Sequence, residues 1–435
     1  MSNKILHSLF KIICSNRSFV LFATIVLSGV LLDNTISSAN SILNASSSSS
    51  SVYSMSTTTA ATPLKPLTHT GVKNAKGNST FTISYKLKKE INSHIDNGSN
   101  AAIVIGLVDP NGTQFYGYGK MSNANQTTVD KNTVFGIGSI TKSFTTLLLT
   151  DIANRGIVNL NDPIKKYLPS TVKVPTYNGV EITLEDLATH TSGLPHDPPN
   201  MPLNGPGFQK YTLEQLYQAL SSIKLTSAPG SKYHYSNFGM ALLGDILSSK
   251  AGMPYEQLVI NRILNVLGMN STRITLSDTL KSRLAIVHRN GRELHTIENP
   301  LPYAPAGGFR STASDMVKYL SANMGLAKSN LSIAMGISHQ PRFNTNLTGF
   351  SSHNRIYIGL AWFTTAPFGN MDTSTNKIIW DNGQFNGYNG FIGFNPNKQK
   401  GVVILCSGVQ RNLRVSQIGF GPYDNLSNLI WTLLN

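Results

Sequence analysis

A serine followed one helical turn later by a lysine is the feature of this chain that most directly indicates chemistry. Ser139 and Lys142 stand in the segment Gly-Ile-Gly-Ser-Ile-Thr-Lys, at the start of a helix predicted over residues 140–155. Side chains three residues apart share one face of a helix. A lysine shielded from water can lose its charge and take the proton of a serine hydroxyl, which makes that oxygen nucleophilic. The pair predicts covalent catalysis through Ser139, although the pattern alone more often marks a capped helix start.

A second segment, Tyr-His-Tyr-Ser-Asn-Phe-Gly over residues 233–239, follows a turn predicted at 228–230. Tyr235 and Asn237 are two residues apart, so on an extended backbone their side chains face the same way. A phenol can shuttle a proton and an amide can hydrogen-bond a substrate. The segment is therefore a candidate partner for the serine, and by itself it is weak evidence.

A third segment lies at the end of a strand predicted over residues 377–381. It contains Asp381, Asn382, Gly383 and Gln384, and its glycine allows a substrate backbone to approach the edge of a strand. These four residues are candidate substrate-binding residues. The three segments can form one site only if the fold brings them together.

The elements that must position these segments follow a simple order along the chain. A helix is predicted over residues 85–95, then strands over 101–108 and 113–119 around the hairpin turn Asp-Pro-Asn-Gly. Helices are predicted over 140–155, 184–189, 213–223, 240–251, 254–266 and 313–322, strands over 355–362, 377–381, 390–395 and 401–406, and a last helix over 425–434. Strands at both ends predict an α+β fold. Its antiparallel β-sheet is formed from both chain ends and flanked by helices, with an inserted, mostly helical subdomain.

The N-terminal 80 residues differ in composition from the rest. Lys4, Lys11 and Arg17 precede an apolar stretch over residues 19–32, and small residues follow at 37–39. This pattern predicts that residues 1–39 are a signal peptide or, if uncleaved, an N-terminal membrane anchor, so that the protein is exported. Residues 40–80 are rich in Ser, Thr and Asn and predict a flexible linker. Residues 81–435 remain as the folded domain.

Composition excludes several other classes of function. The net charge of +15 is spread thinly beyond the N-terminal segment, without the runs of Lys and Arg that a nucleic-acid groove needs. His190, His196 and Asp197 invite a metal site, but their loop lacks the dense ligand cluster of a zinc hydrolase. We therefore expect no nucleic-acid partner, no metal and no cofactor, and nothing in the sequence indicates an oligomeric state.

In this order the three segments resemble those of the serine β-lactamase and penicillin-binding protein superfamily, and its class C-like branch in particular. The third segment corresponds to that family's Lys-Thr-Gly triplet. Two loops are also similar to the family, namely Thr-His-Thr-Ser-Gly-Leu-Pro over residues 189–195 and Pro-Ala-Gly-Gly over 305–308. The segments 160–163 and 167–169 match as well, so the resemblance covers about residues 83 to 433.

The resemblance implies a role for each matching residue. Ser139 would form the acyl-enzyme, Lys142 and Tyr235 would share the proton transfers, and Asn237 would bind the substrate amide. The oxyanion hole would use the backbone N–H groups of Ser139 and Gln384. The substrate would be a small-molecule or peptide-like ester or amide, as for an esterase, a D-aminopeptidase or a carboxypeptidase. An α/β-hydrolase is not indicated, because the serine lacks a Gly-x-Ser-x-Gly turn.

The chain departs from the family at Asp381, where related enzymes usually carry lysine or histidine. If this carboxylate faces the cleft, anionic substrates should bind poorly. The alternative is that Asp381 turns outward and pairs with a neighbour such as Lys377. The departure also leaves open a second function, that of a catalytically impaired family member which serves as an envelope binding or scaffolding protein.

Overall fold

A computed structural model describes residues 82–96, 102–202, 206–289, 292–294, 298–348, 354–367, 376–408, 430 and 433–434. The predicted signal peptide or anchor, the linker and most of the helix predicted over 425–434 lie outside the described residues. Of that last segment, Ile430, Leu433 and Leu434 are helical and buried. None of the helices in the described part of the chain is both long and apolar enough to cross a bilayer.

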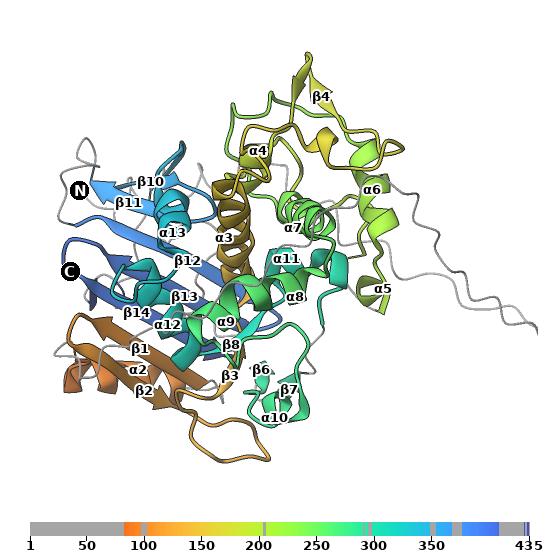
Figure 1. Cartoon of the computed structure of the whole chain (residues 1–435). Coiled ribbons are helices and arrows are strands. Elements are labelled where there is room, and N and C mark those ends of the chain that lie inside the picture. Colours follow the sequence, from red (N-terminus) through yellow and green to blue (C-terminus); the bar gives the residue numbers. More distant parts are fainter. Residues whose placement is uncertain are drawn as a thin grey trace, which may run out of the picture. The chain divides into compact units, whose positions relative to one another are not determined.

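One antiparallel sheet of eight strands organises the described domain (Figure 1). Two strands come from the N-terminal part, β1 (Ala102–Asp109) and β2 (Gly112–Tyr118). Six come from the C-terminal part: β9 (Phe343–Thr348), β10 (Asn354–Ile358), β11 (Phe363–Pro367), β12 (Ile378–Phe385), β13 (Tyr388–Asn395) and β14 (Lys400–Ser407). The order across the sheet is β2-β1-β14-β13-β12-β11-β10-β9. Because β1 pairs with β14, both ends of the chain share one sheet, as the sequence predicts.

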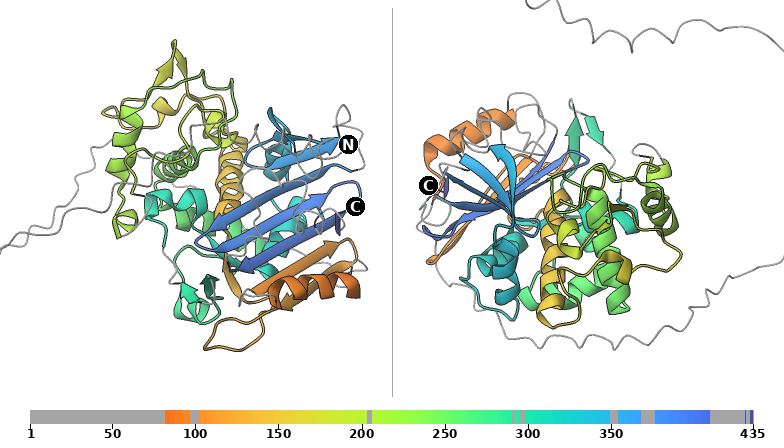
Figure 2. Two further views of the ribbon diagram at one scale, coloured as in Figure 1. Left: turned by 180° about the vertical axis from the view of Figure 1, so that it is seen from behind. Right: turned by 90° about the horizontal axis from the view of Figure 1, so that it is seen from above.

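Helices cover both faces of the sheet (Figure 2). Helix α2 (Tyr85–Asp96) lies on one face, and α3 (Thr141–Asn154), α12 (Ala313–Asn323) and α13 (Ser332–His339) lie on the other. The inserted region contains α4 (Leu184–Ala188), α5 (Pro206–Gln209), α6 (Leu213–Ser222), α7 (Asn237–Ala251), α8 (Tyr255–Val259), α9 (Asn265–Leu267), α10 (Asp278–Lys281) and α11 (Ala304–Gly307). The α+β architecture with an inserted helical subdomain is therefore confirmed.

Short elements complete the connections. They are the 3₁₀ turns η1 (Gly138–Ile140), η2 (Ile164–Lys166) and η4 (Leu301–Tyr303), the π-helical turn η3 (Ile260–Leu264), and three two-stranded sheets. These sheets pair β3 (Val134–Gly136) with β8 (Arg310–Thr312), β4 (Thr176–Tyr177) with β5 (Val180–Glu181), and β6 (Val287–Arg289) with β7 (Arg292–Leu294).

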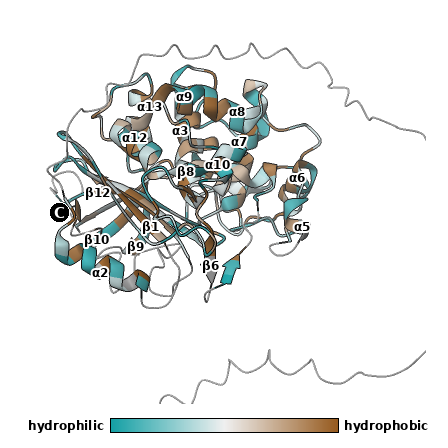
Figure 3. Ribbon diagram, turned by 90° about the horizontal axis from the view of Figure 1, so that it is seen from below, coloured by the Kyte–Doolittle hydropathy of each residue, from teal (hydrophilic) through white to brown (hydrophobic). Residues whose placement is uncertain are grey.

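The alternation of side chains along each strand divides the interior into two cores. On β12, Ile378 and Trp380 pack in the cluster under α2, whereas Ile379 packs in the larger cluster that contains α3. Successive residues of a strand point to opposite faces, so a strand segment covered by helices on both sides is apolar on both, as over residues 402–406 of β14. Figure 3 shows these apolar strands between α2 and the other helices.

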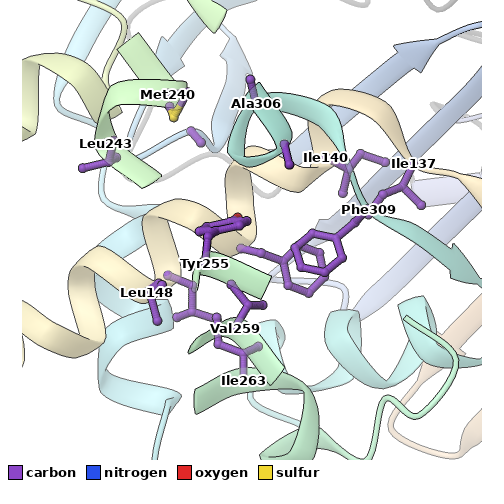
Figure 4. Close-up of a cluster of buried hydrophobic side chains, with 14 of the residues drawn as sticks. Ile137, Ile140, Leu148, Met240, Leu243, Tyr255, Val259, Ile263, Ala306 and Phe309 are labelled. Carbon is purple, nitrogen blue, oxygen red and sulfur yellow. The ribbon is translucent and has the colours of Figure 1, made fainter. Parts of the chain in front are cut away.

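Helix α3 lies between the sheet and the inserted helices and is buried on all sides over residues 141–152 (Figure 1). Its apolar side chains join residues from α7, α8 and α11 in one cluster (Figure 4). Its hydroxyl groups are satisfied internally; Thr146 Oγ1, for example, donates to the carbonyl oxygen of Leu360 at 2.9 Å. A helix held in this way is a rigid support for the side chains at its first turn.

Two predicted elements are interrupted in the structure, and the strand predicted over residues 377–381 continues to Phe385 as β12. The strand predicted over residues 355–362 ends at Ile358, because the chain turns at Ala361, whose φ is 61°, and begins a new strand at Phe363. The helix predicted over 254–266 is divided by the π-helical turn η3, where Arg262 is buried and its Nε donates to Asp151 Oδ2 at 2.9 Å. This buried ion pair gives the irregular turn a structural role.

Candidate active site

Ser139 lies in η1, at the entrance to α3, and its side chain borders a pocket. The preceding Gly138 has a φ of 50°, a conformation that side-chain-bearing residues rarely adopt. A Cβ atom at this position would also lie 2.7 Å from the backbone nitrogen of Gln384 in β12. The glycine therefore allows the serine turn and strand β12 to touch backbone to backbone.

Lys142 lies directly beneath the serine and is only 2% exposed. Its Nζ lies 2.9 Å from Ser139 Oγ and donates to the carbonyl oxygen of Ala306 at 2.5 Å. Burial lowers the pKa of Lys142 to about 7, while the carboxylates of Asp381 and Asp197 oppose this shift. Near neutral pH a large share of Lys142 is therefore uncharged and able to accept a proton.

Tyr235 approaches the serine from the other side. Its hydroxyl donates to Ser139 Oγ at 2.7 Å, and its ring lies 4.9 Å from Lys142 Nζ. Burial raises the pKa of Tyr235 well above its ordinary value, although the hydrogen bond to Ser139 opposes this shift. The phenol is therefore a proton donor at neutral pH, and the serine oxygen is held between it and Lys142.

His190 supports Tyr235 from behind, a role that we did not predict from the sequence. Its ring lies 4.4 Å from the Tyr235 ring, and its Nδ1 accepts the backbone N–H of Ser236 at 3.1 Å. Burial, with the nearby charge of Lys142, keeps the pKa of His190 well below its usual range, so the ring is neutral. His190 adopts a φ of 58°, and its carbonyl oxygen accepts from His234 N at 2.7 Å. The histidine thus holds the tyrosine segment in place.

Asn237 begins helix α7 and also borders the pocket. Its Nδ2 donates to Asp197 Oδ1 at 3.0 Å, and the same oxygen accepts from the hydroxyl of Tyr303. The other carboxylate oxygen lies 2.7 Å from His196 Nδ1. Burial opposes ionisation of Asp197, but these hydrogen bonds lower its pKa to about 2. An ionised carboxylate therefore anchors two side chains of the pocket wall.

Strand β12 forms the opposite wall through Asn382, Gly383 and Gln384. A Cβ atom on Gly383 would lie 1.9 Å from the carbonyl oxygen of Ile137 and 2.8 Å from the backbone nitrogen of Ser139. Only a glycine allows this approach, which brings the Ser139 and Gln384 backbones to the same end of the pocket. Two such N–H groups suit an oxyanion hole, in which one donor is typically worth about 3 kcal/mol.

The pocket has a volume of about 520 Å³, including space open to solvent. Its remaining lining residues are Asn299, Tyr303, Ala306, Gly307 and Phe385. Every lining residue within the described part of the chain is uncharged. Of the eight residues that we predict for the site, six border this pocket, and Lys142 contacts Ser139 from below.

Asp381 is the predicted residue that the structure does not place on the pocket wall. It is 4% exposed and shares the inner face of β12 with Ile379 and Gly383, toward the catalytic turn. Its Oδ1 accepts the N–H of Asn382 at 2.8 Å, and its Oδ2 has no hydrogen-bond partner among the described residues. Burial raises the pKa of Asp381 well above its usual range, opposed by that hydrogen bond and by the charge of Lys142. The alternative of an outward side chain paired with Lys377 is therefore wrong.

The described residues contain no group of three or more His, Cys, Asp or Glu side chains placed to bind a metal ion. His190 accepts a backbone N–H, and His196 lies against Asp197. Both histidines that invited a metal hypothesis thus have structural partners.

The sheet is built from both ends of the chain, and a serine at the start of a buried helix has a lysine and a tyrosine at its oxygen. This arrangement defines an active-site serine hydrolase with the β-lactamase fold. Comparison with known families agrees with this class. A model of the Beta-lactamase family matches residues 88–417, and the chain belongs to this family. It is a β-lactamase-related serine hydrolase.

Among its relatives, the D-alanyl-D-alanine-carboxypeptidase/endopeptidase AmpH of Escherichia coli is 33% identical over 320 residues, which cover 72% of this chain and 81% of AmpH. Beta-lactamase-like protein 4 of Dictyostelium discoideum is 33% identical over 297 residues, 64% of this chain and 51% of that protein. A crystal structure of the β-lactamase/D-alanine carboxypeptidase of Yersinia pestis superposes with a TM-score of 0.65 at 27% identity, covering 81% of this chain and all of that one.

Replacement of Gly383 by alanine tests the contact between β12 and the serine turn. The added methyl group has no room against the Ile137 carbonyl oxygen, so the strand must move away from the Ser139 N–H. We expect Gly383→Ala to reduce kcat on an activated ester by about 10²- to 10³-fold, the range for loss of one oxyanion donor. Gly336→Ala is the matched control, because no atom lies within 4 Å of its added Cβ. Full activity of Gly383→Ala would contradict this geometry.

Replacement of Asp381 by asparagine tests the electrostatic link to Lys142. The carboxylate raises the pKa of Lys142, so its removal should lower that pKa below about 7. The acidic limb of kcat/KM for a neutral ester should therefore shift to lower pH, whereas the exposed Asp278→Asn should leave it in place. An unchanged limb, together with a changed ratio of anionic to neutral substrates, would show that Asp381 acts on the substrate instead.

Proposed function

We propose that this protein is an exported hydrolase that forms an acyl-enzyme at Ser139 with an ester, amide or peptide-like substrate. The observation that carries this proposal is the geometry at Ser139 Oγ, which lies 2.9 Å from Lys142 Nζ and 2.7 Å from the Tyr235 hydroxyl. Such distances allow proton transfer to and from the serine oxygen without further movement.

In the acylation step, uncharged Lys142 takes the Ser139 proton as Oγ attacks the substrate carbonyl carbon. The carbonyl oxygen then carries the negative charge, and the backbone N–H groups of Ser139 and Gln384 stabilise it. When the bond to the leaving group breaks, Tyr235 donates its proton to that group. The proton that Lys142 took then returns to the Tyr235 phenolate, since both groups contact the same serine oxygen.

In the deacylation step, a water molecule attacks the ester carbonyl at Ser139 and loses a proton to the same pair. The carbonyl oxygen occupies the same N–H groups, and Ser139 leaves with a proton from Lys142 or Tyr235. Each group returns to its starting protonation state, so the cycle consumes only substrate and water.

The relatives and the pocket support a peptide-like substrate. AmpH carries D-alanyl-D-alanine-carboxypeptidase in its name and the Yersinia pestis protein carries D-alanine carboxypeptidase, and other relatives are β-lactamases. In this chain the pocket wall offers the amide groups of Asn237, Asn382 and Gln384, which suit hydrogen bonds to an amide-containing substrate. Simple esters fit the same uncharged pocket. Export follows from the predicted signal peptide or anchor over residues 1–39.

The competing function is that of an impaired family member which binds an envelope component without turnover. The main feature that favours this function is Asp381, which stands where the family usually carries lysine or histidine. The contacts of Lys142 and Tyr235 with Ser139 favour the enzyme instead. A fluorescent phosphonate or penicillin probe that labels the folded protein covalently would favour the enzyme, and binding without labelling would favour the scaffold.

Mutation of Ser139 to alanine should abolish hydrolysis of every substrate that the protein accepts, because the nucleophilic oxygen is lost. Mass spectrometry of the wild-type protein with a slow substrate should show one acyl adduct, on Ser139. Ser143→Ala serves as a control, because Ser143 lies on the same helix and its hydroxyl donates to the carbonyl oxygen of Ile140. An adduct elsewhere, or activity of Ser139→Ala, would refute the assignment.

Lys142→Ala and Tyr235→Phe should each reduce kcat by orders of magnitude. Their combined effect should be smaller than the product of the two, because they act as one proton-transfer unit.

The base form of Lys142 increases as pH rises through its pKa of about 7, so wild-type kcat/KM should rise through the same range. A pH profile that is flat between 5 and 9 would contradict the role of Lys142 as the base.

A further inference from the structure

A carboxylate behind the pocket wall has no part in the mechanism above. Asp197 follows the loop at residues 189–195 and its side chain is 20% exposed. It does not border the pocket itself, but two residues that do, Asn237 and Tyr303, both hydrogen-bond to its Oδ1. The opposite oxygen lies 2.7 Å from His196 Nδ1. Three side chains from three separate segments therefore converge on one carboxylate.

We propose that Asp197 is a positioning and specificity-determining residue which makes the site prefer substrates that carry a protonated amine next to the reacting carbonyl. The proposal rests on the proposed acyl transfer at Ser139 and names the substrate class for that reaction.

The hydrogen bonds to Asp197 run in a direction that favours an amine. Tyr303 has one hydroxyl proton, and it donates this proton to Asp197, so toward the pocket its oxygen can only accept. Asn237 uses an N–H of its amide group on the same carboxylate, which fixes the orientation of that amide. An ammonium group has three donors and no acceptor. The wall that Asp197 organises is therefore better matched to an amine than to a carboxylate or a carbonyl group.

The charge of the Asp197 carboxylate also favours an amine. The pocket lining is uncharged within the described residues, so the ionised groups immediately behind it determine its potential. Asp197 is ionised at neutral pH, whereas Lys142 is buried and close to its own pKa. The chain as a whole carries a net charge of +15, which would attract anions. A preference for amines must therefore come from this local carboxylate and not from the protein surface.

The experiment compares alanine p-nitroanilide with its N-acetyl derivative, in both enantiomers, at pH 7. The two compounds share the reacting amide and differ in charge at one nitrogen. We expect the wild-type protein to prefer the free amine. In Asp197→Asn this preference should fall about tenfold, mainly through KM, because asparagine keeps an acceptor oxygen but loses the charge. Asp278→Asn removes a carboxylate from a fully exposed position and should leave the preference unchanged.

A second variant separates charge from positioning. Asp197→Ala removes both the charge and the acceptor, so Asn237 and Tyr303 lose their anchor. It should lose the amine preference and lower kcat on the neutral N-acetyl compound further than Asp197→Asn does, because asparagine keeps an acceptor oxygen for Asn237 and Tyr303. High salt should weaken the wild-type preference and leave that of Asp197→Asn unchanged. An amine preference that survives in Asp197→Asn would overturn the proposal.

Binding to an inactive variant keeps the proposal falsifiable if turnover is absent. Calorimetry with Ser139→Ala should show tighter binding of alanine amide than of its N-acetyl form, and the added replacement Asp197→Asn should remove the difference. Equal affinities in Ser139→Ala would refute the role of Asp197. If instead the proposed function is wrong, the wild-type protein should show no acyl adduct on Ser139.

Discussion

The contact on which the site depends is the close approach of two backbones, the serine turn η1 and strand β12. Gly138 and Gly383 leave no room for side chains between them, so the backbones at positions 139 and 384 lie close together beside the pocket. This approach requires the register that β12 adopts beside β13, and through β14 it depends on β1 from the other end of the chain. The antiparallel sheet thus brings together residues that are far apart in the sequence.

Burial supplies the second half of the chemistry. Helix α3 is enclosed by the sheet and the inserted helices, and the same enclosure removes water from Lys142. Desolvation lowers the pKa of the lysine to about 7, and the carboxylates of Asp381 and Asp197 prevent a larger shift. A lysine with a much lower pKa would be a weaker base, and one with an ordinary pKa would stay charged. The packing that stabilises the domain therefore also sets the reactivity of the site.

The sequence allowed the fold class and most of the pocket to be predicted, because local patterns carry that information. Ser139 and Lys142 are one helical turn apart, and Tyr235 and Asn237 share one extended segment. The anchoring role of Asp197 could not be predicted, since its partner Tyr303 lies 106 residues away and the family pattern over residues 189–195 ends before Asp197. Strand β9 was missed for another reason: it is a mostly polar edge strand with only two apolar residues, and its pairing with β10 shifts register near Asn346, whose φ is 60°.

Asp381 occupies the position at which the family usually carries lysine or histidine, but it interacts with Lys142 and does not border the pocket. In the triplet that it begins, the oxyanion donor is a backbone group, and the close approach depends on Gly383, which is retained. The side chain at position 381 is free to differ without loss of that apparatus. A lysine is long enough to extend from a strand into a cleft, but an aspartate has one methylene group, and here it remains 4% exposed on the face toward Lys142. The charge next to the pocket then comes from Asp197, behind the wall formed by Asn237 and Tyr303, and this is the charge that we propose to select the substrate.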